Sequence, residues 1–151
     1  MTAKGRPAGW AERHLANPLM RALLRIGLAP RAFALLETTG RRTGRLRLTP
    51  VGNGLDGDVF WLVAAHGRRS SYVANLSAEP ACRVKVGRRW RKGTATLIED
   101  DDGLARRARL DKANGIIGRL DGFAFKATAT DPTTIRIDLK PDPHPSTNSD
   151  T

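Results

Sequence analysis

The sequence predicts one α+β domain, a small β-barrel of about six strands with helices at its periphery. The chain has 151 residues, enough for a single domain with a substantial core. Short apolar or alternating runs, bounded by glycine, proline or aspartate, recur through its middle part and are typical of strands. Helical periodicity lies outside these runs, which favours a mixed barrel over a parallel α/β sheet. We expect a flexible segment over residues 1–9, this domain over 10–140 and a disordered tail over 141–151.

The first element that we expect is a basic amphipathic helix from Trp10 to about Ile26. Leucines recur there at helical spacing, and arginines occupy other positions around the helix. Gly27 and Pro30 end it. A helix of this kind either caps a barrel or lies on an acidic membrane surface, so peripheral membrane contact stays open as an alternative.

The stretch from Leu35 to Pro50, LLETTGRRTGRLRLTP, predicts a β-hairpin with an unusual turn. Leu35–Thr39 reads as one strand and Arg45–Thr49 as the next, with the proline expected to stop it. Gly40 and Gly44 bracket the turn, where a glycine permits positive φ or a close approach to a ligand.

Four arginines and a threonine concentrate hydrogen-bond donors in this turn. They are Arg41, Arg42, Thr43, Arg45 and Arg47. Guanidinium groups and exposed backbone N–H groups suit phosphate or carboxylate oxygens, often with two hydrogen bonds at a time. The turn is therefore either an anion-binding site or a solvated basic hairpin that protects a sheet edge from aggregation.

A strand buried on both faces is expected to follow the hairpin. Asp56-Gly57 favours a tight turn, and Val59–Ala65 is almost entirely apolar. That strand delivers a polar loop, His66 to Ser71, to its end, where side chains can meet a ligand. The elements expected next are a helix over Tyr72–Ser77, strands over Cys82–Val86, Arg89–Ile98 and Thr134–Leu139, a helix over Gly103–Asn114 beginning at an acidic cluster, and a short helix or loop over Ile116–Phe125.

The net charge limits the classes of partner. The chain has 26 Lys+Arg against 15 Asp+Glu, a formal charge of +11, and a pI of about 11.1. Such a balance predicts attraction to nucleic acid, an acidic membrane surface or a multiply charged cofactor. Aromatic residues make up only 5% of the chain and no recognition motif is present, so we expect no specific nucleic-acid partner.

Location and redox environment follow from simple counts. No apolar run approaches the ~18 residues that a membrane span needs, and the N-terminus lacks the apolar core of a secretory signal. The single cysteine, Cys82, excludes an intramolecular disulfide and fits a reducing compartment. We therefore expect a cytoplasmic protein.

No self-sufficient catalytic set is visible. The three histidines lie far apart without metal-ligand spacing, so we expect no metal site. A nucleophile elbow, a P-loop and a dinucleotide fingerprint are also missing from the sequence. If the chain is an enzyme, a cofactor is expected to supply the demanding chemistry.

The motif TTGRRTG at Thr38–Gly44 with the Pro50 that follows, the apolar strand ending at Ala64-Ala65, and Asn75-Leu76 resemble the deazaflavin-dependent nitroreductase family. The likeness runs from about Phe33 to Val86 and, less closely, to the last strand. It implies a split β-barrel of the FMN-binding type that holds coenzyme F420, an 8-hydroxy-5-deazaflavin with a phospholactyl-oligoglutamate tail. The implied reaction is hydride transfer from reduced F420 to a quinone, an enone or a similar conjugated or nitro acceptor.

The resemblance also implies which residues hold the cofactor. Arg41, Arg42, Thr43 and Arg47 would hold its phosphate and acidic tail; Thr49, Pro50 and Val51 would line the deazaflavin edge; Ala64, Ala65, His66 and Gly67 would lie against the ring; Ser71, Tyr72 and Asn75 would complete the site. Because Tyr72 is the only tyrosine, the expected proton donor is His66 or Tyr72.

Other readings stay open. The same barrel can hold a cofactor, a fatty acid or a tetrapyrrole without turnover, and the short loop before Asn75 with the single tyrosine favours that class. An FMN-dependent oxidoreductase, with the FMN phosphate on the Arg41–Arg47 turn, is a lesser alternative, and a nucleic-acid binder is a further one. The protein is expected to act as a monomer or a homodimer.

Overall fold

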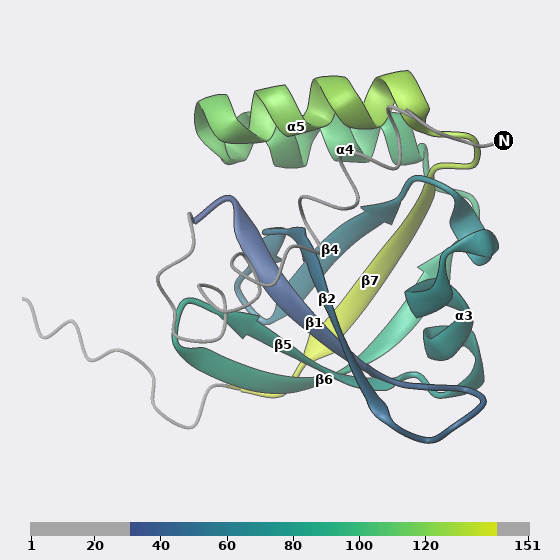
Figure 1. Ribbon diagram of the computed structural model, residues 1–151. Helices are drawn as coiled ribbons and strands as arrows, with labels where there is room; N and C mark the ends of the chain where they lie inside the picture. The colour runs from purple at the N-terminus through teal and green to yellow at the C-terminus, as the bar shows by residue number, and fades with distance from the viewer. Residues whose placement is uncertain (1–30, 142–151) are drawn as a thin grey trace, which may run out of the picture.

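The computed structural model describes residues 31–141, except for the side chains of four residues of one helix, and shows an antiparallel sheet curled into a half-barrel (Figure 1). The strands are β1 (Phe33–Thr39), β2 (Leu46–Gly52), β3 (Leu55–Asp56), β4 (Val59–Ala64), β5 (Ala81–Val86), β6 (Arg89–Ile98) and β7 (Thr133–Leu139), in the sheet order β2-β1-β5-β6-β7-β4-β3. The helices are η1 (Gly67–Arg69), α3 (Ser71–Ala78), α4 (Gly103–Ala113) and α5 (Gly115–Thr128).

The α+β barrel expected from the sequence is confirmed, with a correction to its strand count. The sheet has seven strands rather than about six, because two-residue β3 pairs with β4 across the turn at Gly57 and Asp58. The helix expected over Trp10–Ile26, and with it residues 1–9 and the tail from residue 142, lies outside the described residues.

Strand β2 continues through Pro50 instead of stopping before it. Pro50 lies opposite Leu35 in the β1–β2 register, and β2 ends only at Gly52. A proline lacks the N–H that a central strand would need, but β2 is the outermost strand of the sheet order, so no second strand needs that donor.

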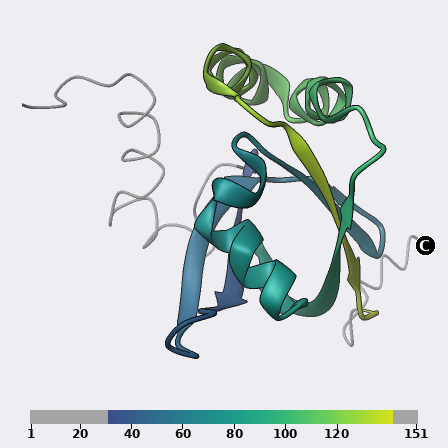
Figure 2. The ribbon, with the colours of Figure 1, turned by 90° about the vertical axis from the view of Figure 1, so that its right-hand side faces the viewer.

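The interior of the half-barrel is filled by alternate residues of the strands together with two residues of α3. Figure 2 shows α3 lying between the two limbs of the curled sheet. The buried cluster consists of Ala34, Leu36, Val51, Phe60, Leu62, Ala64, Val73, Leu76, Cys82, Val84, Ala95, Ile135, Ile137 and Leu139. Because each strand except β3 contributes residues of one parity, this cluster sets which face of β2 and β4 points inward.

The segment that follows β2 joins the β1–β2 side of the sheet to β4. The Asn53 N–H donates to the Ala32 carbonyl at 2.8 Å, and the Trp61 N–H donates to the Gly54 carbonyl at 2.9 Å. An ideal Cβ placed on Gly54 would lie 1.8 Å from the Trp61 carbonyl oxygen. Only glycine therefore permits this approach, which brings the chain from the β1–β2 side of the sheet to β4.

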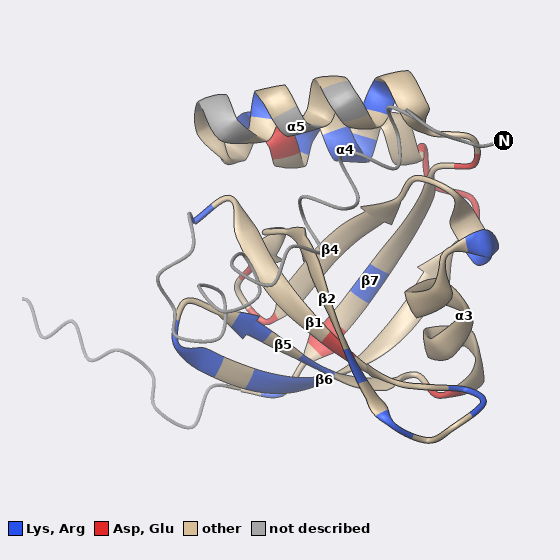
Figure 3. Ribbon diagram, in the orientation of Figure 1, with Lys and Arg blue, Asp and Glu red and all other residues tan. Residues whose placement is uncertain are grey.

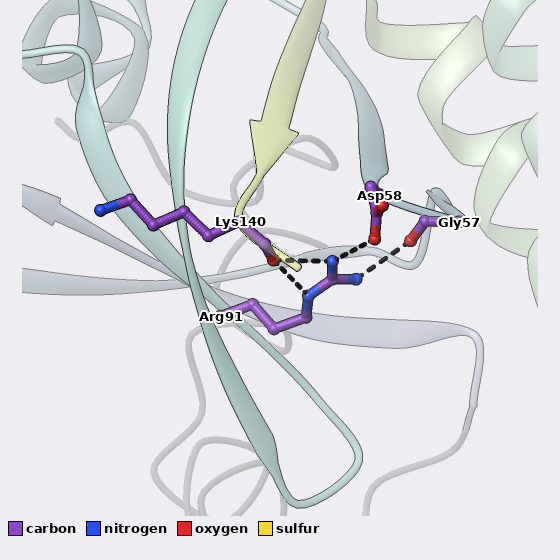
Figure 4. Close-up of polar contacts among 4 residues, drawn as sticks. All are labelled: Gly57, Asp58, Arg91 and Lys140. Carbon is purple, nitrogen blue, oxygen red and sulfur yellow. Dashed lines mark hydrogen bonds and ion pairs between the residues drawn. The ribbon is translucent and has the colours of Figure 1, made fainter. Parts of the chain in front are cut away.

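Arg91 of β6 holds the far end of the sheet together (Figure 4). Its guanidinium donates to the Lys140 carbonyl at 2.8 and 3.1 Å, to the Gly57 carbonyl at 3.0 Å and to the Asp58 carboxylate at 2.6 Å. One largely buried side chain thus joins the β3–β4 turn to the residue that follows β7.

Helices α4 and α5 lie side by side on one side of the sheet (Figures 1 and 2), and α4 packs against the outer face of β4 and β7. The Arg106 guanidinium of α4 lies over the Trp61 ring of β4, 4.1 Å from its centroid. The segment Ile116–Phe125, left open as helix or loop, is part of helix α5, because Gly118 and Gly122 face α4. A Cβ at these two positions would lie 2.4 Å and 2.0 Å from atoms of Asp111.

The N-terminus of α4 is anchored by two aspartates of the predicted acidic cluster. Asp102 caps the helix by accepting from the Ala105 N–H at 3.1 Å. Asp101 accepts from the Arg106 guanidinium at 3.1 Å and from the Thr134 hydroxyl at 2.8 Å. These bonds, first of all those from Arg106, hold the pKa of the Asp101 carboxyl below its ordinary value.

This lowered pKa predicts a loss of stability in acid. A carboxyl with a depressed folded-state pKa stabilises the protein above its unfolded pKa, and that stability is lost as the pH falls through the folded value. We expect the Asp101→Asn variant to lose roughly 1 kcal/mol at neutral pH and to show a weaker dependence of melting temperature on pH below about 4. Thermal unfolding of both proteins across this pH range tests it, and parallel curves would contradict it.

Candidate functional site

The turn between β1 and β2 is closed by its own backbone. The Gly40 N–H donates to the Arg45 carbonyl at 2.7 Å, and the Gly44 N–H donates to the Gly40 carbonyl at 2.8 Å. Gly44 has φ of +71°, which favours glycine. The Thr43 hydroxyl accepts from the Arg45 N–H at 3.2 Å, so this side chain shapes the turn. Figure 3 shows that Lys and Arg positions gather at this turn, at the tip of the β1–β2 hairpin.

Asn75 of α3 docks the turn onto the rest of the molecule. Its Oδ1 accepts from the Arg41 N–H at 3.1 Å and from the Arg41 guanidinium at 3.0 Å. Its Nδ2 donates to the Thr38 hydroxyl of β1 at 3.2 Å. The Arg41 guanidinium also reaches the Ser71 carbonyl at 3.4 Å. Asn75 and Thr38 are buried, so Asn75 positions the turn from beneath it.

Removing this connection is expected to loosen the turn. The Asn75→Leu variant keeps the side-chain size but leaves the Arg41 N–H and the Thr38 hydroxyl without their partner, at a cost of about 1–3 kcal/mol. Denaturant unfolding measures this loss, with Ser77→Ala on the exposed side of the same helix as the control. Equal stability of Asn75→Leu and the parent chain would contradict the positioning role.

Arg42 and Arg47 differ from Arg41 because their side chains have no hydrogen-bond or ion-pair partner among the described residues. Both are exposed, and neither side chain makes a hydrogen bond or an ion pair with another residue of the described range. Arg47 lies opposite Thr38 in the β1–β2 register. It therefore shares the inward-facing side of β2 with Thr49 and Val51, at the open end beside α3. Two unpaired guanidinium groups at one edge can bind an anion.

The other predicted site residues of β2 can offer backbone groups to a ligand more readily than side chains. Val51 is buried in the core cluster, Thr49 is half-buried, and Pro50 points to the opposite face of the sheet from both. Because β2 is an edge strand, part of its backbone has no strand partner in the described sheet. These positions therefore suit the predicted role of presenting backbone groups to a ligand.

The end of β4 forms the second part of the site. The Ala65 carbonyl accepts from the Thr130 and Asp131 N–H groups, both at 2.9 Å, and the His66 Nδ1 lies 3.0 Å from the Thr130 hydroxyl. Gly67 is buried with φ of +53°, and a Cβ there would lie 2.3 Å from an Asp131 carboxylate oxygen. The loop after α5 thus packs directly on the predicted strand end, while Ala64 is buried in the core.

Tyr72 and Cys82 are poor candidates for proton or nucleophile chemistry. Tyr72 packs against the core cluster, and burial raises the pKa of its phenol well above the ordinary value, although the nearby Arg107 charge opposes this. Its hydroxyl can donate a hydrogen bond but is a weak acid there. Burial likewise raises the pKa of the Cys82 thiol to about 11, which keeps it protonated.

Two groups of predicted residues are thus brought together. Arg41, Ser71 and Asn75 meet between the hairpin turn and α3, and Ala65, His66 and Gly67 lie at the end of β4, joined to α3 through η1. Sequence reasoning missed Thr38, Thr130 and Asp131, since nothing local links them to partners 37 or 64 residues away. No group of three or more potential metal ligands gathers within residues 31–141.

The comparison with protein families assigns the chain. The profile of the F420H(2)-dependent quinone reductase family matches residues 13–137, which is most of the sequence. The chain belongs to this family. It is therefore an oxidoreductase that uses reduced coenzyme F420, as the family resemblance led us to expect. No curated protein matches it.

Solved structures place the F420H2-dependent reductase among the split β-barrels. An F420-H2 dependent reductase, FDR-A, is 20% identical with a TM-score of 0.51, covering 73% of this chain and 95% of its own. The heme storage protein HutZ from Vibrio cholerae is 14% identical with a TM-score of 0.53, covering 83% and 91%. A chain described as a domain-swapped dimer is 17% identical with a TM-score of 0.54, covering 87% and 99%. At these identities the likeness concerns the fold alone.

The residues of this reductase suit the cofactor that its family requires. F420 carries a phosphate and several carboxylates, and the exposed Arg42 and Arg47 side chains, which have no partner among the described residues, have the charge and hydrogen-bond donors that such groups need. The uncapped N-terminus of α3 lies beside them, because Arg41 joins the turn to Ser71.

Among the described residues, no helix is both long and apolar enough to span a membrane.

Proposed function

We propose that this chain reduces a quinone or a similar conjugated acceptor with F420H2 bound between the β1–β2 turn and the end of β4. The observation that carries the proposal is the pair of exposed cations, Arg42 and Arg47, which have no partner in the described part of the chain and lie beside the N-terminus of α3. These groups would hold the phosphate and the acidic tail, and Arg41 with Asn75 would keep the turn in place.

When bound, reduced F420 supplies a hydride. The chain's own task is to hold the acceptor close to the ring and to supply a proton. We assign the proton to the His66 imidazole, which the Thr130 hydroxyl orients through Nδ1. Tyr72 contributes a neutral hydrogen-bond donor at most, because burial raises its pKa. Because Gly67 has no side chain, the loop that contains Asp131 can pack directly against the end of β4.

This assignment predicts a turnover defect in His66→Gln. The amide can still bond Thr130 but cannot transfer a proton, so we expect kcat to fall by about a hundredfold while the F420 Kd changes less than twofold. Steady-state oxidation of F420H2 by a soluble quinone, together with a binding titration, separates the two effects. Arg68→Ala, an exposed neighbour, is the control. An unchanged kcat in His66→Gln would remove His66 from the mechanism.

The function itself is tested by titrating the purified chain with F420, FMN and heme at moderate salt. Selective F420 binding followed by quinone-dependent oxidation of F420H2 supports the proposal. F420 binding without oxidation of F420H2 by quinone or enone acceptors would make the chain a binding protein of the same fold. Heme is included because HutZ, named as a heme storage protein, shares the fold. Selective FMN or heme binding would overturn the proposed site.

We further propose that the protein is cytoplasmic and forms a homodimer or acts as a monomer. The neighbour described as a domain-swapped dimer supports the first assembly. Light scattering after size exclusion distinguishes the two. Membrane contact through residues 10–26 stays a prediction from their basic amphipathic sequence.

A further inference from the structure

We propose that the outer face of α4 and α5 docks on an anionic lipid surface. These two helices form one side of the molecule, and Figure 2 shows no described strand beyond them. The proposal concerns a surface distinct from the cofactor site. Binding to lipid therefore does not depend on the function proposed above.

The first observation is an exposed apolar group on this face. Phe123 is 79% exposed and Leu120 is 68% exposed. Phe123 and Leu120 are three residues apart, so they lie on one side of α5. The opposite side of α5 carries Gly118 and Gly122, which contact Asp111 of α4. Large apolar side chains gathered in this way on a helix surface mark an interaction site.

The second observation is the charge around this group. Arg119 and Lys126 flank the apolar pair on α5, and Arg109 and Lys112 are exposed on α4. Asp111, the acid of α4, is buried and paired with Arg107 at 2.8 Å. Of the six Lys/Arg in residues 103–128, Arg106 is paired with Asp101 and Arg107 with Asp111, so the four exposed cations named above are the others. Figure 3 shows basic positions along both helices.

Apolar residues bordered by cations suit lipid headgroups better than a second copy of this face. Lysine and arginine side chains are attracted to anionic headgroups, while the apolar residues enter the interfacial region. Two copies of the same face would instead bring like charges together. The C-terminal end of α5 leads to the predicted active site, since Thr130, two residues after α5, contacts His66. A lipid-dissolved acceptor would therefore arrive close to the strand end.

Flotation of the full chain with vesicles tests the proposal. We expect binding to vesicles of phosphatidylcholine and phosphatidylglycerol but not to phosphatidylcholine alone. The Leu120→Gln/Phe123→Gln variant is expected to lose at least tenfold in partition coefficient. The Arg119→Gln/Lys126→Gln variant is expected to lose about fivefold for each charge removed. All four side chains are exposed, and circular dichroism with thermal unfolding shows whether each variant is folded.

Two control variants separate this face from the general positive charge of the chain. Leu55→Gln removes an exposed leucine of β3, and Arg88→Gln/Lys92→Gln removes two exposed cations at the β5–β6 hairpin. Unchanged binding in both controls supports the proposal. Equal losses in the controls and in the α5 variants would overturn it, as would self-association of the chain through α5 in place of vesicle binding.

A spectroscopic measurement gives an independent answer if a variant is unstable. Cys82 is the only cysteine and is buried, so a polarity-sensitive thiol probe placed by Phe123→Cys labels one position. A blue shift of the probe with anionic vesicles supports insertion of this face. No shift, while the protein still floats with the vesicles, would assign the membrane contact to another surface and overturn the proposal.

Discussion

The double variant Arg42→Ala/Arg47→Ala is expected to bind F420 about 30- to 150-fold more weakly than the parent chain. Each guanidinium can make charge-assisted hydrogen bonds worth roughly 1.5–3 kcal/mol, and because both are exposed we expect about 2–3 kcal/mol for the pair. The loss should fall on affinity, because neither side chain lies at the end of β4, where the proton donor is placed. Fluorescence titration of F420 measures it directly.

Two comparisons make this result specific. Arg88→Ala removes an exposed arginine at the β5–β6 turn, which the strand register puts at the opposite end of β1 from the hairpin turn, and should leave the F420 Kd unchanged. Raising the salt concentration should weaken F420 binding to the parent chain more than to the double variant, since fewer charges remain to be screened. If the double variant binds F420 as tightly as the parent does, the turn is not the anion site.

Gly54→Ala is expected to destabilise the fold by roughly 3 kcal/mol or more. The added methyl group would lie 1.8 Å from the Trp61 carbonyl oxygen, and the Trp61 N–H already donates to the Gly54 carbonyl. Neither side of this contact is a flexible side chain, so the backbone must move apart and the hydrogen bond weakens. The link between the two sides of the sheet is lost with it. Urea unfolding followed by tryptophan fluorescence measures the change.

Gly52→Ala is the matched control for this substitution. It lies two residues earlier, and a Cβ there meets nothing within 4 Å. We expect its free energy of unfolding to stay within about 0.5 kcal/mol of the parent value. Comparable effects of the two substitutions would mean that the Gly54–Trp61 contact does not hold the sheet ends together.

Most strands could be predicted because their signals are local. The alternation in Thr134–Leu139 and the apolar run Val59–Ala65 correspond to β7 and β4 within one residue at their ends. The boundary at Pro50 was wrong, since a proline stops a strand only where a neighbour needs its N–H. The helix α5 was ambiguous, because its glycines read as interruptions until α4 is known to lie against them.

For the candidate site too, some features could be predicted from the sequence and others depend on the tertiary structure. The sequence alone indicated an anion as the ligand of the turn, with a solvated basic hairpin as the alternative, because guanidinium groups and glycines are concentrated in one short segment. Only the tertiary structure decided their separate tasks. Arg41 is held by the buried Asn75, while Arg42 and Arg47 have no side-chain partner within residues 31–141 and are the ones that we propose for the anion. The physical reason is that a side chain's role depends on the partners that folding brings to it, and those partners, like Thr130 for His66, come from distant parts of the chain.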